Sequence, residues 1–521
     1  MTLERNESPK SLEQIQKYFV DPNNTEVSED LAELSGEAIR VMAQIYAHGG
    51  DIDEMPNKYK EWLKNSDEDP DSLRGVLGTI LSEECKTRRF DNRFLGQIHP
   101  QGNKIGILGN MIAAYMNTNM IFEGVSQSET LMEKESIQWL AKTFGFPETA
   151  TGNIVSGGTL ANQACLKIAR DRALDSLGLK YDLNARVESK IPPMYVLTTK
   201  WRHYSVEKQC DTLGLGLIEI EADNFKMVPK RLEEKIIQLK DAGKIPVAIV
   251  GLAGETETGM IDDLKTLSEI AKRQNVFFHV DAAYGGSFML SRAQTEYYYF
   301  DGISEADSIT VDPHKLLYIP YSAGAFLVKN PENHNLLHSD SRYIRALAKT
   351  VEGTRGSAGT ISTYATIKLL GREGFRTIMN HTLDLAEYAF GQIEQSDILT
   401  PLHEPQLNTV LMRLSDKFKH VLKEKGFTNQ KIEGVLCGME KTYFDVMEPG
   451  KHYLAVNNGV DEDKTADFSF SGFRYIGMHP YTTENDVKNA LNDLQAQLLI
   501  RFDDLAKVDN EVYNDPAVLM K

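Results

Sequence analysis

Lys315 occupies an unusual place in the sequence. It follows the apolar run Ser308–Val311 and a short Asp-Pro-His segment, and Leu316 and Leu317 come directly after it. A lysine that is partly withdrawn from water at the end of a strand is a nucleophile suited to Schiff-base chemistry. The alternative is a lysine whose stem lies on apolar surface and whose ammonium group reaches water.

Two further segments place reactive residue types directly after apolar runs. In NIVSGGTLAN, Gly157, Gly158 and Thr159 precede a helical pattern, and the free N–H groups of a helix amino end bind phosphate. In VFFHVDAAYGG, Asp281 ends an apolar strand, where an ionised carboxylate needs a partner. The plainer alternatives are a helix N-cap for the first segment and a turn cap for the second.

Together, these three features suit pyridoxal phosphate. The glycine segment would take the phosphate, Asp281 would pair with the protonated pyridine nitrogen, and Lys315 would hold the aldehyde as an imine. His203, in TTKWRHYSVEKQC, also follows an apolar run, and we expect it to lie flat on the ring; otherwise it is a surface histidine in a loop. The sequence at Gly157 is not a GxxxxGK[ST] loop, so a nucleoside triphosphate is not favoured.

The elements that must position these residues alternate between strand and helix. Helical patterns separate apolar β-type runs at 193–199, 246–254, 276–286, 307–312 and 324–329. This order is typical of an α/β fold with a mostly parallel sheet and helices on both faces. Ligands bind at the carboxyl ends of the strands in such sheets, which is where the candidate residues lie.

Three regions follow from these patterns. We expect residues 1–105 to form a helical N-terminal segment and residues 106–365 to form a large α/β domain that binds the cofactor. Residues 366–521 begin with a long helical pattern and continue with strand-like and helical segments. They predict a smaller C-terminal α+β domain.

Composition narrows the function. The 521 residues are 41% hydrophobic and 25% charged, which is ordinary for a globular protein, and the formal net charge of -18 argues against nucleic acid and anionic membrane as partners. The segment MTLERNESPK lacks the apolar stretch of a signal peptide, and no apolar run is long enough to span a membrane. The four cysteines have neither CxxC nor metal-like spacing. We therefore expect a cytoplasmic protein without a metal site.

The chain resembles the pyridoxal-phosphate-dependent group II amino-acid decarboxylases, the family of glutamate, aspartate, tyrosine and aromatic decarboxylases. The resemblance covers residues 90–375 and rests on SGGTLAN, RHYSVEK, GETETGMIDDL, HVDAAYGG, ADSITVDPHK and VEGTRGSAGT, in this order. Within the family, the chain is most similar to bacterial aspartate 1-decarboxylases and archaeal tyrosine/aspartate decarboxylases. The resemblance implies the PLP-dependent transferase fold (fold type I) with a seven-stranded sheet, and a homodimer with active sites at its interface.

The same resemblance implies roles for single residues. Lys315 would be the Schiff-base lysine and Asp281 the partner of the pyridine nitrogen. His203 would stack on the ring, with Ala283 at the opposite face. The other cofactor contacts would be Gly158, Thr159, Thr256 and His314, with Gly353 and Thr354 approaching the phosphate from the second chain of the dimer.

The segment RFLGQIHPQGN would read the substrate side chain, with Phe94, Gln97 and His99 as candidates. Arg355 would receive a side-chain carboxylate or form an intersubunit salt bridge. Arg474, in FSGFRYIGM, resembles the family arginine that meets the substrate α-carboxylate. We expect an acidic substrate, aspartate or glutamate, and the alternative is tyrosine or another aromatic amino acid, because Phe94 and His99 are able to pack on a ring.

Tyr343 follows Lys315 in the sequence, and we expect it to be structural rather than a proton donor.

Other functions are compatible with parts of the sequence pattern. A carbon–carbon lyase acting on a phosphorylated amino alcohol shares the GxRxG and HK signatures, but it would need a cationic pocket for a second phosphate. A non-catalytic relative would have no need of Lys315, Asp281 and His203 together, which argues against that alternative.

Overall fold

The computed structural model describes residues 25–47, 51–67, 73–84, 91–181, 191–342, 344, 348–442, 452–463 and 468–507. The chain divides into two compact units, one of Met1–Arg89 with Asp445–Lys451 and one of Phe90–Phe444 with His452–Lys521. The domain boundaries that the sequence suggests at residues 105 and 365 stay predictions.

The described part of the first unit is helical. It contains α2 (Thr25–Ala47), α3 (Asn57–Asp67) and α4 (Leu73–Glu84), with a short 3-10 helix at Ile52–Glu54. The buried side chains of this small core are Val41, Ile45, Met55, Trp62, Leu63 and Leu81.

The second unit is built on a seven-stranded sheet with the strand order β1-β9-β8-β7-β6-β2-β3. Neighbours from β3 to β8 pair in parallel, whereas β9 runs antiparallel to both β8 and β1. The predicted mostly parallel sheet is therefore confirmed. Its strands are β1 (Thr151–Val155), β2 (Met194–Thr199), β3 (Gly216–Ile220), β6 (Ile245–Leu252), β7 (Phe277–Asp281), β8 (Ser308–Val311) and β9 (Gly324–Val328).

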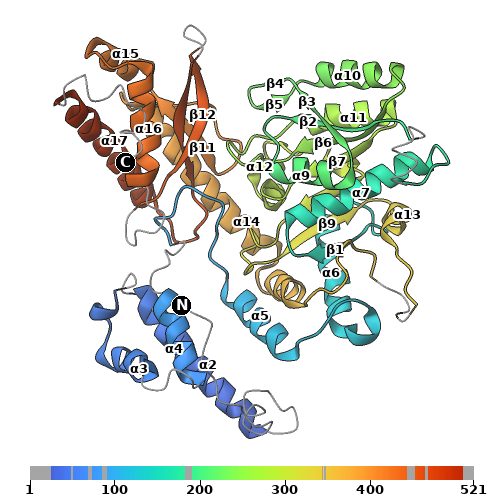
Figure 1. Cartoon of the computed structure of the whole chain (residues 1–521), viewed down its shortest axis with the longest axis horizontal. Helices are drawn as coiled ribbons and strands as arrows, with labels where there is room; N and C mark the ends of the chain where they lie inside the picture. The colour runs from blue at the N-terminus through green and yellow to red at the C-terminus, as the bar shows by residue number, and fades with distance from the viewer. Residues whose placement is uncertain are drawn as a thin grey trace, which may run out of the picture. The chain divides into compact units, whose positions relative to one another are not determined.

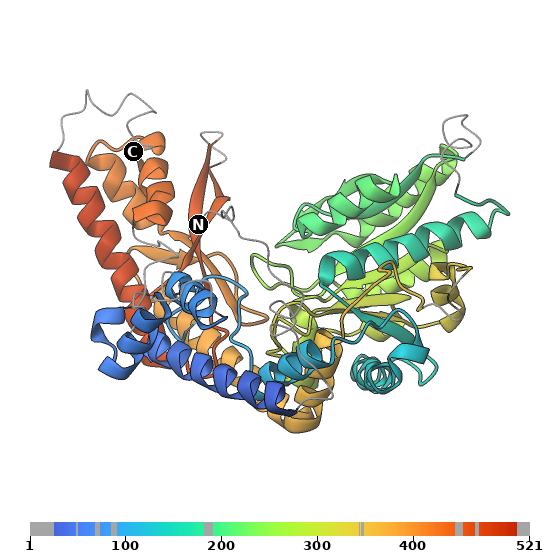
Figure 2. The ribbon, with the colours of Figure 1, turned by 60° about the horizontal axis from the view of Figure 1, so that its bottom comes forward.

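Helices cover both faces of this sheet (Figures 1 and 2). Ile249 and Phe278 enter the core under α6, α10 and α11, whereas their neighbours Ala248 and Phe277 enter the opposite core under α7 and α9. Because both faces are buried, the strands read as continuous apolar runs instead of alternating ones. The helices are α6 (Gln127–Thr143), α7 (Gly158–Asp175), α9 (Tyr204–Leu213), α10 (Pro229–Asp241) and α11 (Leu264–Gln274).

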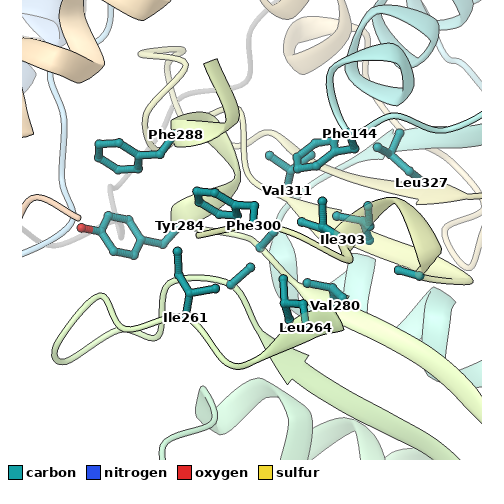
Figure 3. Close-up of a cluster of buried hydrophobic side chains, with 14 of the residues drawn as sticks. Phe144, Ile261, Leu264, Val280, Tyr284, Phe288, Phe300, Ile303, Val311 and Leu327 are labelled. Carbon is teal, nitrogen blue, oxygen red and sulfur yellow. The ribbon is translucent and has the colours of Figure 1, made fainter. Parts of the chain in front are cut away.

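An aromatic cluster fills the first of these cores. Figure 3 shows Phe144, Phe288 and Phe300 among aliphatic side chains that include Val280 and Val311. Full burial of a side chain of this kind contributes about 1.5–3 kcal/mol relative to exposure. The cluster therefore holds in place the end of β7, where Asp281 lies, and the end of β8, after which the segment that leads to Lys315 begins.

Helix α14 (Ala358–Glu394) joins the large sheet to the smaller domain. It is interrupted at Gly371, whose φ of 57° and ψ of -172° lie in a region that glycine alone adopts readily. Beyond the break, Phe375 and Met379 pack in the core of the large domain, whereas Ala389 and Ile393 pack in the core of the small domain. One helix therefore contributes to both cores.

The small domain contains a four-stranded antiparallel sheet with the order β10-β11-β13-β12. The segment before residue 96 extends it: Leu95 N donates to Tyr453 O (2.8 Å), and Ile476 N donates to Leu95 O (2.7 Å). The elements are β10 (Leu399–Pro401), β11 (Thr409–Leu414), β12 (Ala455–Asp463), β13 (Phe468–Ile476), α15 (Asp416–Glu424), α16 (Asn429–Thr442) and α17 (Glu484–Lys507).

The other described elements are short, apart from α5 (Lys104–Met116), which the Asn103 side chain caps by accepting from Gly106 N (2.9 Å). None of the described helices combines the length and the apolar character that a bilayer crossing requires. The short elements are β4 (Ala222–Asp223), β5 (Lys226–Met227), α12 (Arg292–Thr295), α13 (Pro331–His334) and 3-10 helices at Glu123–Val125, Gly285–Leu290, Ile303–Glu305 and Asn335–Leu337.

Candidate active site

A cavity of about 250 Å³ lies at the carboxyl ends of the parallel strands. Residues that directly follow β1, β2, β7 and β8 line it, as expected for an open α/β sheet. The structure brings nine of the predicted site residues together around this cavity: His99, Gly158, Thr159, His203, Thr256, Asp281, Ala283, His314 and Lys315.

Asp281 is buried, and both of its carboxylate oxygens accept hydrogen bonds. Asn162 Nδ2 donates to Oδ2 (2.9 Å), and the Ala283 N–H donates to Oδ1 (3.1 Å). Asn162 Oδ1 lies 2.9 Å from Nε2 of His279, and burial lowers the pKa of His279, so this ring is neutral. Ser308 Oγ lies 2.9 Å from the other ring nitrogen. A ring that donates from Nε2 fixes the orientation of the Asn162 amide and keeps its donor on Asp281.

His203 caps the amino end of α9 and is tied to the same network. Its Nδ1 accepts from Ser205 N (3.3 Å) and lies 2.8 Å from Ser205 Oγ, which also accepts from Asn162 Nδ2 (3.2 Å). Burial lowers the pKa of His203, the nearby Asp281 opposes this shift, and Lys315 adds to it. Because Nδ1 is an acceptor, the neutral ring carries its proton on Nε2.

The amino end of α7 forms a narrow cradle. A Cβ atom on Gly158 would lie 2.7 Å from Asp312 Oδ2, so no larger residue fits here unless the carboxylate moves. His314 lies near the same carboxylate, with Nε2 3.6 Å from Asp312 Oδ2. Its Nδ1 accepts from Ala323 N (3.0 Å), and burial lowers the pKa of His314, although Asp312 opposes the shift.

Lys315 lies in the turn after β8, with its Nζ 3.1 Å from Asp312 Oδ2. The side chain is 19% exposed, and that of Asp312 is 3% exposed, so this ion pair is largely withdrawn from water. His99 lies close enough that burial first, and then the charges of Lys315 and Arg474, lower the pKa of its ring. Two cations, Lys315 and Arg474, therefore lie near the ring of His99.

Arg474, on β13, is buried and bound only by backbone carbonyls within the described ranges. Nε and Nη2 donate to Gly96 O (3.1 and 2.8 Å), and Nη1 donates to Thr256 O (2.8 Å). A guanidinium group has five N–H donors, and three are used here. Burial lowers the pKa of Arg474. The residue is not among those that line the cavity, but it contacts the backbone of Thr256, which does line it.

Phe94 and Gln97 were predicted to read the substrate, but they lie outside the cavity. Phe94 is buried in the small-domain core and stacks on Tyr453, with ring centroids 4.6 Å apart, and Gln97 Nε2 donates to Tyr453 Oη (2.9 Å). The reason is the backbone pairing of Leu95 with Tyr453, which fixes this segment along the small sheet.

Arg355 also lies away from the cavity, in a second hollow lined by Glu133 and His334. Its Nη1 contacts Glu133 Oε1, and its Nη2 donates to Glu133 Oε2 (2.8 Å). The guanidinium group is therefore held by a carboxylate of its own chain, which was not among the two predicted roles. Gly353 and Thr354 are exposed in the segment before α14, and Tyr343 lies outside the described residues.

Several residues that the sequence analysis did not select line the cavity: Asn162, Trp201, Ser205, Asp312 and Tyr321. Asp312 directly follows β8, so the rule that identified Asp281 applied to it equally. Asn162 lies one helical turn after Gly158, which places it on the same face of α7. The hydroxyl of Tyr321 lies 2.9 Å from His99 Nδ1, a contact without any signal in the sequence.

Three observations show that the residues of the cavity suit pyridoxal phosphate. A helix amino end opens onto it at Gly158, a buried carboxylate with two fixed donors stands at Asp281, and the amine of Lys315 reaches the same space. Phosphate, pyridinium and aldehyde each meet the group that their chemistry requires.

Comparisons with known proteins agree with this assignment. The model of the pyridoxal-dependent decarboxylase conserved domain matches residues 55–415. The chain is 33% identical over 450 residues to an aspartate 1-decarboxylase of Aliivibrio fischeri, covering 80% of this chain and 81% of that one. It is 30% identical over 355 residues to an L-tyrosine/L-aspartate decarboxylase of Methanocaldococcus jannaschii, covering 66% of this chain and 86% of that one.

Solved structures share the fold. The crystal structure of mouse CSAD superposes with a TM-score of 0.75 at 22% identity, covering 92% of this chain and 99% of that one. The glutamate decarboxylase domain of a Vibrio parahaemolyticus protein gives 0.73 at 22% identity, covering 94% and 99%. The extent of these matches and the geometry of the cavity lead to one conclusion: this chain belongs to the pyridoxal-dependent decarboxylase family and is a carboxy-lyase that uses pyridoxal 5'-phosphate.

Proposed function

We propose that this enzyme removes the α-carboxylate of an acidic L-amino acid, aspartate or glutamate, and releases the amine and carbon dioxide. The buried Arg474 supports binding of an α-carboxylate, because its cation has no carboxylate partner among the described residues and keeps donors for an anion. The preference for an acidic side chain is supported by the small size of the cavity and by the names of two relatives. The cavity of about 250 Å³ must hold cofactor and substrate, and ligand pockets usually span roughly 300–1,000 Å³. A small substrate side chain fits that space best.

The cofactor, when bound, supplies an electron sink for the bond that breaks. In this proposal Lys315 is its covalent anchor, and Asp281 keeps a proton on the pyridine nitrogen through a charge-assisted hydrogen bond. His203 lies against one face of the ring and Ala283 against the other. Thr256 contacts the cofactor, and the phosphate is bound by Gly158, Thr159 and His314.

Two parts of the site are assigned to the substrate. Arg474 binds the α-carboxylate through its remaining N–H donors, while the carbonyls of Gly96 and Thr256 hold the guanidinium group in place. His99 and Tyr321 lie at the end assigned to the side chain. The names of two relatives, aspartate 1-decarboxylase and L-tyrosine/L-aspartate decarboxylase, support an acidic substrate.

Tyrosine is the second candidate. Trp201, Tyr204 and Tyr321 line the cavity and offer aromatic surface to a ring. The second relative is named for both substrates, and others are named for aromatic amino acids and 2,4-diaminobutyrate.

We also infer a cytoplasmic homodimer. Helix α5 exposes an apolar face, and monomeric proteins rarely leave large contiguous apolar patches in water. Gly353 and Thr354 are exposed and available to a second chain, as the proposed role at its phosphate requires. The exposed apolar side chains of α5 are Ile107, Leu108, Met111, Ile112, Tyr115 and Met116.

The test is carbon dioxide release from single L-amino acids by the purified enzyme, with the visible spectrum recorded in parallel. We expect kcat/KM to be highest for aspartate or glutamate, and tyrosine to be the next best substrate. Highest activity on 2,4-diaminobutyrate, whose side chain is cationic, would overturn the acidic preference. Lys315→Ala should lose the absorbance of the covalently held cofactor, and an unchanged spectrum would refute the role of Lys315.

A further inference from the structure

Asp312 is a buried carboxylate that the roles assigned so far do not use. The residue is 2% exposed, lines the cavity, and directly follows β8. Its Oδ2 lies 3.1 Å from Lys315 Nζ, whereas its Oδ1 has no hydrogen-bond partner within the described part of the chain. A buried carboxylate oxygen without a partner is costly, so it marks a place where another group belongs.

This carboxylate stands at the amino end of α7. A Cβ atom built on Gly158 would lie 2.7 Å from Oδ2 and 3.0 Å from Oδ1. Gly158 and Thr159 are the residues assigned to the cofactor phosphate. A phosphate dianion bound there would meet the negative charge of Asp312 at close range in a poorly solvated site, where like charges repel strongly.

The ammonium group of Lys315, with its Nζ 3.1 Å from Asp312 Oδ2, offsets part of that repulsion and is the one lysine or arginine among the described residues that line the cavity. His314 faces Asp312, but burial lowers the pKa of its ring, and its Nδ1 accepts from Ala323 N. Asp281 and His203 line the same cavity, as do Glu255, His99 and Tyr321. Burial raises the pKa of Tyr321 to about 12, and Asp312 adds to this shift. The closest proton available to Asp312 is therefore on the ammonium group of Lys315.

We propose that binding of phosphate at the α7 amino end drives a proton from Lys315 Nζ to Asp312, which activates the lysine only when the cofactor is in place. The N–H bond at Nζ breaks and an O–H bond forms on Oδ2, so the pair changes from ammonium and carboxylate to amine and carboxylic acid with no change in net charge. The neutral amine then condenses with the aldehyde, releasing one water molecule, and the neutral Asp312 no longer repels the phosphate. The inference rests on the proposed role of Lys315 as the covalent anchor.

The test separates the phosphate from the aldehyde. Full-length protein freed of cofactor is mixed with pyridoxal, which carries the aldehyde but no phosphate, and condensation is followed by absorbance with and without inorganic phosphate. Chloride at equal ionic strength controls for salt. We expect phosphate to accelerate condensation at least about tenfold in the wild-type protein, because it supplies the charge that displaces the proton. In Asp312→Asn the acceleration should disappear.

A second measurement does not depend on any variant. Infrared difference spectra of the cofactor-free wild-type protein should show the carbonyl stretch of a protonated carboxyl group when phosphate is added, and Asp312→Asn should lack that band. The matched control is Asp307→Asn, the same substitution at the opposite end of β8, where the carboxylate accepts from Phe278 N (2.9 Å). It should keep both the acceleration and the band.

Each outcome decides between the alternatives. The inference is overturned if phosphate fails to accelerate condensation in the wild-type protein, or accelerates it equally in Asp312→Asn. If Lys315→Ala still condenses with pyridoxal at the wild-type rate, the proposed role of Lys315 fails instead. Loss of the acceleration in Asp312→Asn, with retained condensation and an unchanged thermal midpoint, supports the proton transfer and excludes misfolding.

Discussion

Asp281 depends on its neighbours for its chemistry. Its two oxygens are fixed by Asn162 and by the backbone of Ala283, and the amide of Asn162 is in turn oriented by the neutral ring of His279. An isolated carboxylate would be expensive to bury here. The two donors satisfy both of its oxygens at the place where the pyridine nitrogen is expected.

Asn162→Asp tests this arrangement. It would place a second carboxylate about 3 Å from Asp281, and two carboxylates at such a distance share one proton. We expect the affinity for pyridoxal phosphate to fall at least about tenfold and turnover to fall further, measured by equilibrium dialysis and by carbon dioxide release. Asn110→Asp on α5 is the control, since Asn110 Oδ1 only accepts from Ser362 Oγ (2.7 Å). Wild-type affinity in Asn162→Asp would contradict the assignment.

Arg474 is tested by Arg474→Gln. Glutamine is shorter and uncharged, so the α-carboxylate would lose a buried charge-assisted partner. We expect kcat/KM to fall roughly a hundredfold or more, while the absorbance of the bound cofactor stays unchanged. Arg413→Gln, on the neighbouring strand β11, removes an ion pair with Asp416 and should have little effect. Equal losses in both variants would mean that Arg474 acts only in stability.

At the scale of elements, the first residue of α7, Gly158, must be a glycine because the side chain of Asp312, which follows β8, lies against it. Gly158→Ala would place Cβ 2.7 Å from Asp312 Oδ2, so either the carboxylate or the helix end must shift. We expect cofactor affinity to drop at least about tenfold, measured by dialysis. Gly391→Ala within α14, where no atom lies within 4 Å of the added Cβ, should preserve affinity and slightly raise the thermal midpoint. Unchanged affinity in Gly158→Ala would show that the cradle is wider than the structure indicates.

The loop between β10 and β11 carries a half-buried histidine that makes stability depend on pH. His403 Nε2 accepts from Leu411 N (3.3 Å), its Nδ1 lies 3.1 Å from Glu404 O, and burial lowers the pKa of His403 from 6.5 to about 4. A lowered folded-state pKa means that the unfolded chain binds the proton more strongly. The stability from this residue is therefore complete above pH 6.5 and decreases as the pH falls toward 4.

The steepest loss is about 1.4 kcal/mol per pH unit. Urea unfolding at pH 7 and pH 5 measures it. His403→Gln keeps an acceptor but does not titrate, so the difference between the two pH values should shrink, whereas His338→Gln, at an exposed side chain, should behave like the wild type. An equal pH dependence in His403→Gln and the wild type would contradict the prediction.

At the scale of the whole molecule, the apolar face of α5 is the surface to test for self-association. Ile112 is 55% exposed and lies among other exposed apolar side chains of the helix. We expect the wild-type protein to sediment as a dimer, and Ile112→Glu to weaken the dimer and reduce activity, because a buried interface would then contain an unpaired charge. Lys104→Glu, at the solvated start of α5, is the control. A monomeric wild-type protein with full activity would exclude the proposed interface role.

The structure confirms the parts of the fold that depend on local pattern. Because helices cover both faces of the large sheet, its strands are continuous apolar runs that can be recognised in the sequence. The residues that follow the parallel strands meet at one edge of the sheet. This is why Lys315, Asp281 and His203 could be placed at one cavity from spacing alone. The same rule applies to Asp312, which directly follows β8 and lines the same cavity.

The residues that the sequence misplaced depend on pairs far apart in the chain. Phe94 lies against the small domain because Leu95 pairs with Tyr453, and Arg355 is neutralised by Glu133, more than two hundred positions earlier. Nothing in either local segment specifies its partner. The sequence by itself determined which reactive groups come together, since residue type and position after a strand place Lys315, Asp281 and His203 at one cavity. The tertiary structure alone decided which charges remain available to the substrate, because a buried charge is free or satisfied according to neighbours that only folding brings within hydrogen-bond distance.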